Sequence, residues 1–124
     1  MKKTVLIVED AAVQRALYAS LLTKMGLSVV TAESGGVGLE LARRHRPGMI
    51  LSDYVMPDMN GLELCAAVRK DPRIRDTIFL IFTAIEPSDE EKGHFHDQPD
   101  GWLDKNRGPE AVAAGVKAWL EMLG

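Results

Sequence analysis

Cysteine is almost absent from this sequence, with Cys65 as the only one among 124 residues. A single thiol cannot form an internal disulfide, so a reducing compartment is the default expectation. Excess basic charge is also missing, because the formal net charge is −3 at pH 7. This balance argues against a nucleic-acid or anionic-membrane surface, since both need clustered lysine and arginine. We therefore expect neither nucleic acid nor a membrane among the direct partners.

Long apolar runs are missing too, since no segment approaches the length of a membrane span. The first residues, MKKTVLIV, resemble a signal peptide, but the apolar run stops at Glu9 and no small-residue cleavage site follows. Hydrophobic residues nevertheless make up 46% of the chain, which suffices for one globular core at this length. These features predict a single soluble domain over residues 1–124 in the cytoplasm.

Strand and helix patterns alternate along the whole chain. The apolar segments that predict buried strands are residues 4–8, 27–32, 49–52, 78–82 and 101–104. A helical pattern follows each of them, and the last one begins at Pro109. Such alternation predicts an open sheet of five parallel strands between two layers of helices, with right-handed crossovers.

The first predicted helix lies between Asp10, which can cap it, and Gly26, which ends it. Its apolar residues recur at helical spacing and are expected to face the core: Val13, Leu17, Leu21, Leu22 and Met25.

Polar side chains gather where the predicted strands end. Glu9 and Asp10 follow the first strand, Asp53 the third, Thr83 the fourth and Lys105 the fifth. In parallel sheets ligands bind beyond the carboxyl ends of the strands, so these side chains should meet at one edge. Three carboxylates there raise one another's pKa, and a divalent cation removes the conflict. Carboxylate oxygens favour Mg²⁺ over Zn²⁺, and a lysine and a hydroxyl beside them suit phosphoryl transfer.

With these residues in order, the sequence resembles the receiver domains of bacterial response regulators in two-component signalling. The motifs that carry the resemblance are Glu9-Asp10, the segment DYVMPDMNG that begins at Asp53, the pair Thr83-Ala84, and Lys105. The resemblance covers essentially the whole chain. It implies a flavodoxin-like sheet of strand order 2-1-3-4-5, and a signalling switch rather than an enzyme that turns over a metabolite.

The resemblance also implies a role for each matching residue. Asp53 would be the phosphoacceptor, with Lys105 and Thr83 as partners of the phosphoryl oxygens. Mg²⁺ (or Mn²⁺) would be held by Glu9, Asp10, Asp53 and the backbone carbonyl of Val55. Thr83 and Trp102 would form the switch, in which the threonine moves toward the phosphate and the aromatic ring turns inward.

The implied partners are a sensor histidine kinase or phosphotransfer protein, which donates the phosphoryl group, and a downstream protein or effector domain that the sequence does not name. The expected state is a monomer or weak homodimer.

Two segments depart from the family pattern. Asn106 follows Lys105, where the family usually has proline in a cis peptide. Since a cis bond before a non-proline residue costs about 2.5–4 kcal/mol, we expect a trans Lys105–Asn106 bond, with Gly108 letting the loop adjust so that Lys105 still reaches the site. The fourth helix, expected within residues 88–98, contains Gly93 and has only Phe95 as a clearly apolar residue. It should therefore be short, frayed or mobile.

Several alternatives accompany this interpretation. The chain could be a receiver that no longer accepts a phosphoryl group and only binds partners. A flavin-binding electron carrier of the same fold would need a Ser/Thr/Gly-rich phosphate loop after the first strand, and the sequence there is EDAAVQ. An aspartate-nucleophile phosphatase would need a D-x-D arrangement at that strand. His94 and His96 suggest a metal site, although such a pair in a polar loop is usually solvated.

Overall fold

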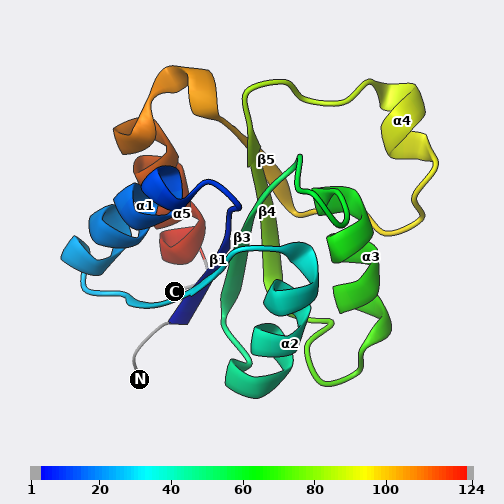
Figure 1. Ribbon diagram of the computed structural model, residues 1–124, viewed down its shortest axis with the longest axis horizontal. Helices are drawn as coiled ribbons and strands as arrows, with labels where there is room; N and C mark the ends of the chain where they lie inside the picture. Colours follow the sequence, from blue (N-terminus) through cyan, green and yellow to red (C-terminus); the bar gives the residue numbers. More distant parts are fainter. Residues whose placement is uncertain (1–3, 123–124) are drawn as a thin grey trace.

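The fold is a parallel sheet of five strands with helices packed against both of its faces (Figure 1). A computed structural model describes residues 4–122. Its strands are β1 (Thr4–Val8), β2 (Ser28–Ala32), β3 (Met49–Asp53), β4 (Ile78–Thr83) and β5 (Gly101–Asp104). Its helices are α1 (Ala12–Lys24), α2 (Gly35–His45), α3 (Gly61–Lys70), α4 (Asp89–Gly93), the 3-10 turn η1 (Lys105–Arg107) and α5 (Pro109–Met122).

The strand order is β2-β1-β3-β4-β5, which confirms the predicted architecture. All neighbouring strands pair in parallel, so their carboxyl ends meet at one edge of the sheet. Along that edge Val8 pairs with Ser52, Asp53 with Phe82, and Thr83 with Asp104. The register therefore places the residues that follow β1, β3, β4 and β5 next to one another.

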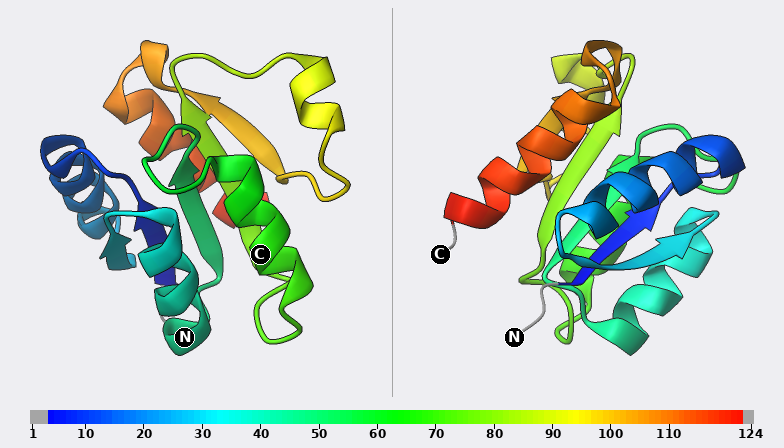
Figure 2. Two further views of the ribbon diagram at one scale, coloured as in Figure 1. Left: turned by 45° about the vertical axis from the view of Figure 1, so that its right-hand side comes forward. Right: turned by 90° about the vertical axis from the view of Figure 1, so that its left-hand side faces the viewer.

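Two hydrophobic clusters fasten the helices to the sheet, one on each face. Because side chains alternate along a strand, Val5 and Ile7 of β1 face α1 and α5, whereas Leu6 and Val8 face α2 and α3. Figures 1 and 2 show these two helix pairs on opposite sides of the sheet. Burial on both sides explains why the central strands are apolar throughout.

Helix α1 turns only part of its predicted apolar face inward: Leu22 is buried, and Leu21 and Met25 pack against the same core, as predicted. Tyr18 and Leu22 are its buried residues, and the Tyr18 ring meets the Phe82 ring edge-on at 4.8 Å between centroids. Val13 is 83% exposed and Leu17 is 43% exposed, so the prediction that they face the core is wrong. A tyrosine offers more apolar area to the sheet than either of them, and the helix turns to bury it.

The start of α1 also differs from the expectation. The residue preceding the helix is Ala11, which has no side chain that could cap it, and Asp10 lies one position too early to do so. The carboxylate of Glu9 instead accepts a hydrogen bond from the amide of Ala11 at 3.2 Å. Asp10 is therefore free of a capping role and remains exposed.

Helix α4 has only five residues and buries none of them, as its lack of apolar residues predicted. Its start is capped by Ser88, whose hydroxyl accepts the amide of Glu91 at 3.2 Å. Its mobility stays a prediction. No helix within residues 4–122 combines the length and the apolar character needed to cross a membrane.

Gly61 brings the start of α3 against the end of β3. A Cβ atom built on this glycine would lie 2.8 Å from the backbone oxygen of Asp53 and 3.2 Å from Cδ1 of Ile81. The backbone cannot yield as a flexible side chain would, so we expect Gly61→Ala to lower the free energy of unfolding by about 1–3 kcal/mol, measured by urea denaturation.

Gly93 supplies the matched control, because a Cβ atom there meets nothing within 4 Å. Gly93→Ala should leave stability unchanged or raise it by up to about 1 kcal/mol. Equal stability of the Gly61→Ala variant and the wild type would contradict the close packing of α3 on β3.

Candidate functional site

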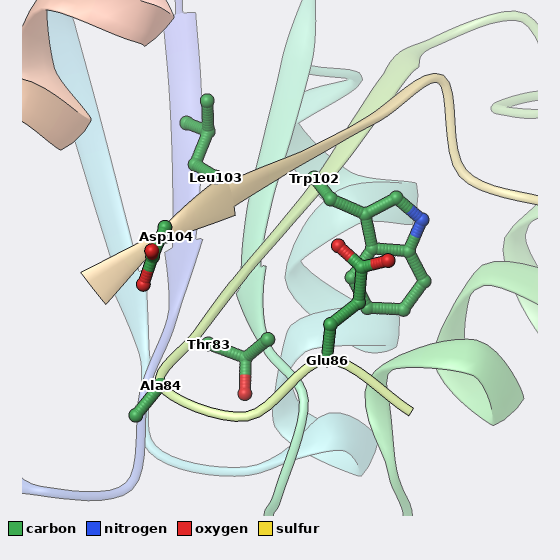
Figure 3. Close-up of a pocket in the computed structure, with 6 residues that line it drawn as sticks. All are labelled: Thr83, Ala84, Glu86, Trp102, Leu103 and Asp104. Carbon is green, nitrogen blue, oxygen red and sulfur yellow. The ribbon is translucent and has the colours of Figure 1, made fainter. Parts of the chain in front are cut away.

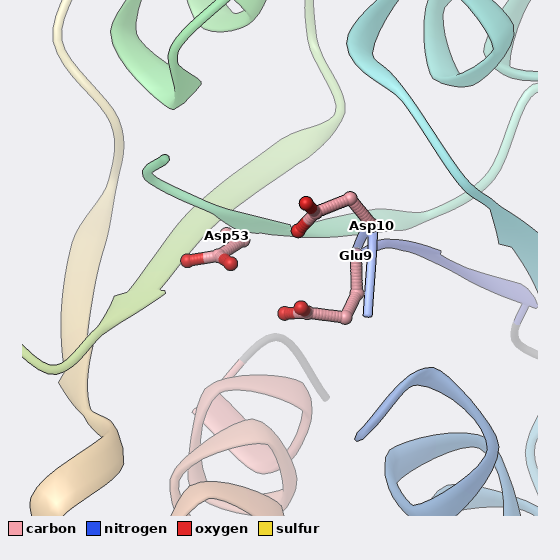
Figure 4. A group of neighbouring side chains, drawn as sticks. All are labelled: Glu9, Asp10 and Asp53. Atoms are coloured by element: carbon pink, nitrogen blue, oxygen red, sulfur yellow. The ribbon is translucent and has the colours of Figure 1, made fainter. Parts of the chain in front are cut away.

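Three carboxylates converge at the carboxyl edge of the sheet. Glu9 and Asp10 follow β1, and Asp53 is the last residue of the neighbouring strand β3. Each offers an oxygen atom within 4.8 Å of the others, and Figure 4 shows the side chains of Glu9 and Asp10 extending toward the side on which Asp53 lies. Glu9 is 1% exposed and Asp53 is 8% exposed, whereas Asp10 faces solvent. Hard oxygen donors with one open side form a set that fits Mg²⁺.

Lys105 places its ammonium group among these carboxylates. Its Nζ lies 2.9 Å from Oε2 of Glu9 and 3.1 Å from Oδ2 of Asp53. It also donates to Oε1 of Gln14 at 3.1 Å and lies 4.7 Å from the centroid of the Phe82 ring. There is no cis peptide bond within residues 4–122, so the Lys105–Asn106 bond is trans as expected. Gly108, at φ +96°, turns the loop back into α5.

Burial and the contacts between charged groups have opposing effects on the pKa values of Glu9 and Lys105. Burial raises the pKa of Glu9, and the nearby charge of Asp53 adds to this rise, while the hydrogen bond from Lys105 opposes it. Burial alone would lower the pKa of Lys105, but its hydrogen bond to Glu9 and the charge of Asp53 outweigh burial and raise it. Lys105 therefore stays protonated and supplies the positive charge that two buried carboxylates need.

Thr83 ends β4, but its hydroxyl group is occupied by its own turn. Oγ1 donates to the carbonyl of Ile85 at 3.1 Å and accepts the amide of Ile85 at 3.3 Å. The structure thus brings Glu9, Asp10, Asp53 and Lys105 together. The Thr83 hydroxyl is hydrogen-bonded to Ile85 instead.

Trp102 lies on β5 beside a small cavity that also touches Thr83. The cavity has a volume of about 170 Å³, and Figure 3 shows its lining: Thr83, Ala84, Glu86, Trp102, Leu103 and Asp104. The Trp102 ring is tilted against the Tyr54 ring at 6.2 Å between centroids. Lys92 of α4 places its Nζ 4.7 Å from the Trp102 ring and forms an ion pair with Glu86. Trp102 is therefore in contact with Tyr54 in the loop after β3 and with Lys92 of α4, and it shares the cavity with the loop after β4.

Comparisons with known proteins agree with this arrangement. The family model described as response regulator receiver domain matches residues 5–117. The polar-differentiation response regulator DivK of Brucella anthropi is 33% identical over 92 residues, which are 74% of this chain and 75% of that protein. The solved structure of the chemotaxis response regulator CheY4 of Vibrio cholerae has a TM-score of 0.84 at 32% identity, covering 95% of this chain and 98% of that one.

This chain belongs to the response regulator receiver domain family.

Some relatives are much longer than this receiver domain. Histidine kinase P4 of Formosa agariphila is 41% identical over 83 residues, which are 67% of this chain and 6% of that protein. The chain spans only 10% of the length of another such relative, a sensor histidine kinase of Pseudomonas aeruginosa.

Receiver domains act as signalling switches rather than as classical enzymes, and the family binds Mg²⁺ at an acidic pocket. Within residues 4–122, Glu9, Asp10 and Asp53 are the one group of three or more Asp, Glu, His or Cys residues whose ligand atoms lie close enough together to hold an ion. His94 and His96 belong to no such group.

Sequence reasoning missed several residues that support this receiver site. The guanidinium group of Arg15 donates to the backbone carbonyls of Glu9 at 2.8 Å and Asp10 at 3.3 Å, which steadies the acidic loop. Nothing in the spacing of Arg15 signals this contact. Asn60 and Glu63 form a capping box at the start of α3, and the pattern N-x-x-E would have identified it.

Asp58 joins the loop after β3 to the start of α2. Its carboxylate accepts the amide of Gly36 at 2.8 Å and that of Gly35 at 3.1 Å. These hydrogen bonds, with that of Gly36 the stronger, lower the pKa of Asp58 below its usual value. Since these amides open α2, the carboxylate also meets the positive end of the helix dipole.

Replacing Asp58 by alanine should lower the free energy of unfolding at pH 7 by about 1 kcal/mol. Folding lowers the pKa of this carboxyl, so its stabilisation is complete above the unfolded pKa of about 4 and is lost as the pH falls through the folded value. The deficit of Asp58→Ala should therefore shrink in denaturation experiments below about pH 4. Asp76→Ala, which removes an exposed carboxylate without a hydrogen bond among the described residues, is the control. A deficit independent of pH would contradict the contact.

Proposed function

We propose that residues 1–124 form one receiver domain that works as a phosphorylation-controlled switch, with Asp53 as the phosphoacceptor. The observation that carries the proposal is the contact of Lys105 Nζ with both Glu9 and Asp53, at the open edge of the sheet. A buried carboxylate that ends a strand, faces solvent on one side and has a fixed cation beside it is suited to attack an anionic phosphoryl group.

In the proposed reaction an oxygen of Asp53 forms a bond to the phosphorus of a phosphohistidine. The phosphorus–nitrogen bond breaks, the imidazole keeps the electron pair and takes up a proton, and an acyl phosphate remains on Asp53. Lys105 leaves the Asp53 oxygen to hold a phosphoryl oxygen, and Thr83 donates to another once its hydroxyl leaves Ile85. Glu9, Asp10, Asp53 and the carbonyl of Val55 would hold Mg²⁺ or Mn²⁺, which when bound neutralises charge on the phosphoryl oxygens.

The switch would couple this chemistry to the surface around α4 and β5. Movement of Thr83 toward the phosphoryl group would change the cavity that it shares with Trp102. An inward turn of the Trp102 ring would in turn break its contact with Lys92 of α4. A downstream partner could then read the new surface. We also propose that the domain is cytoplasmic and that it is a monomer or a weak homodimer.

The first test is intact mass after incubation with acetyl phosphate and Mg²⁺. We expect one added phosphoryl group on the wild type and none on Asp53→Asn, because the amide is a poor nucleophile. Asp76→Asn, an exposed aspartate elsewhere, serves as the control and should react normally. Fluorescence of Trp102 in a Trp119→Phe background should change with the same time course.

Chelation of the divalent cation should abolish the addition in every variant. Addition to Asp53→Asn would refute the assignment of the acceptor. Absence of any addition to the wild type, from acetyl phosphate and from a phosphorylated histidine protein alike, would favour the alternative of a partner-binding module that no longer accepts a phosphoryl group.

The phosphodonor partner is proposed to be a histidine kinase or phosphotransfer protein that docks on α1. Val13 and Leu17 are exposed apolar residues one turn apart on this helix. Gln14, between them in sequence, reaches the Lys105 ammonium, so this apolar pair borders the acidic site. A helical partner that packs on α1 would bring its histidine to Asp53.

Replacing Val13 and Leu17 together by serine should lower kcat/KM for transfer from a phosphorylated histidine phosphotransfer protein by about tenfold or more, since buried apolar contacts dominate such interfaces. The rate with acetyl phosphate should not change, because that donor needs no docking surface. Met122→Ser removes another exposed apolar side chain, 75% exposed on α5, and should affect neither rate. Unchanged transfer in the double variant would exclude docking on this face of α1.

A further inference from the structure

Asn106 connects the two loops that supply Lys105 and Thr83. Its backbone amide donates to Oδ1 of Asp104 at 2.8 Å, which holds it at the start of the η1 turn. Its side-chain Nδ2 donates to the backbone carbonyl of Ala84 at 2.7 Å. A proline at this position could make neither bond, since it lacks both donors. The residue that departs from the family pattern thus makes a contact that the usual residue cannot.

The bond to Ala84 acts on the peptide group that holds Thr83. The carbonyl of Ala84 and the amide of Ile85 belong to one peptide unit. Asn106 binds the oxygen of this unit, and Thr83 Oγ1 accepts from its N–H at 3.3 Å. The orientation of a single peptide plane is therefore fixed from both sides. Rotation of that plane would break both hydrogen bonds together.

The position of this bond explains why it can hold the whole loop. Thr83 pairs with Asp104 at the end of the β4–β5 ladder. The contact between Asn106 and Ala84 continues that pairing beyond the strand ends, with a side chain in place of the main chain. Figure 3 shows Thr83 and Ala84 at the turn where β4 leaves the sheet. The loop that carries Thr83 is thereby tied to the loop that carries Lys105.

We propose that Asn106 is a positioning residue that holds the Ala84–Ile85 peptide, and with it Thr83, in the resting orientation. The inference rests on the proposed function, because it concerns the movement of Thr83 toward a phosphoryl group. Release of this contact is part of the switch, so the contact favours the resting state. Its loss shifts the equilibrium toward the state in which Thr83 reaches the site.

The test compares the wild type with Asn106→Leu, whose side chain has nearly the same shape but no amide group to donate to Ala84. Beryllofluoride, a phosphoryl mimic, is titrated with Mg²⁺ present, and Trp102 fluorescence in the Trp119→Phe background reports binding. Because a resting-state hydrogen bond is lost, apparent affinity should rise roughly two- to tenfold. Asn106→Ala, which lacks the same donor, should give the same rise. Equal or weaker binding by both variants would overturn the proposal.

Two comparisons separate positioning from a general structural role. In a Thr83→Ala background the gain from Asn106→Leu should disappear, because the tether acts through the Thr83 hydroxyl. Arg107→Leu adds the same side chain to the next exposed position of the loop, where the arginine has no hydrogen bond among the described residues. It should not raise the affinity. A gain that persists without Thr83, or one that also appears in Arg107→Leu, would refute the assignment.

A measurement without any phosphoryl mimic distinguishes this inference from the proposed function. Solvent exchange of the Ile85 amide, followed by NMR, should be faster in Asn106→Leu than in the wild type, while the amides within β4 keep their protection. Unchanged exchange at Ile85 would overturn the tether even if the domain accepts a phosphoryl group. Failure of the wild type to bind beryllofluoride would instead overturn the switch role together with the proposed function.

Discussion

Repulsion among three carboxylates at one sheet edge is the constraint on which the rest of this structure depends. Two of them, Glu9 and Asp53, are almost fully buried, and two buried negative charges so close together are unstable without a cation. Lys105 supplies that charge from the far side of the site. The chain separation between Lys105 and Glu9 is 96 residues, so only a nearly complete fold can bring the pair together.

The sheet solves this assembly problem through its register. Parallel pairing of β1 with β3, β3 with β4 and β4 with β5 aligns four strand ends that lie far apart in sequence. Helices on both faces keep the central strands dry, which leaves the carboxyl edge as the place where polar groups of the sheet meet solvent. Gly61 and Asp58 then fasten the loop after β3 to α3 and α2.

The loops after β4 and β5, on the other side of the site, are linked through a side chain. One hydrogen bond from Asn106 joins them, in a position exposed to solvent. A single exposed hydrogen bond contributes little to global stability, yet here it acts on a peptide that also binds Thr83. Small energies at such a point can shift a two-state equilibrium without affecting the fold.

The sequence by itself determined the strands, their parallel arrangement and the grouping of Glu9, Asp10, Asp53 and Lys105. These follow from apolar periodicity and from the rule that parallel strands end at one edge. Tertiary structure decided which side of α1 is buried, because Val13, Leu17 and Tyr18 are all apolar enough to face the sheet and only packing against Phe82 selects among them. It also decided where the Thr83 hydroxyl points and what Arg15 and Asn106 bind. Those contacts involve backbone carbonyls, which every residue carries, so no pattern of side chains in the sequence can reveal them.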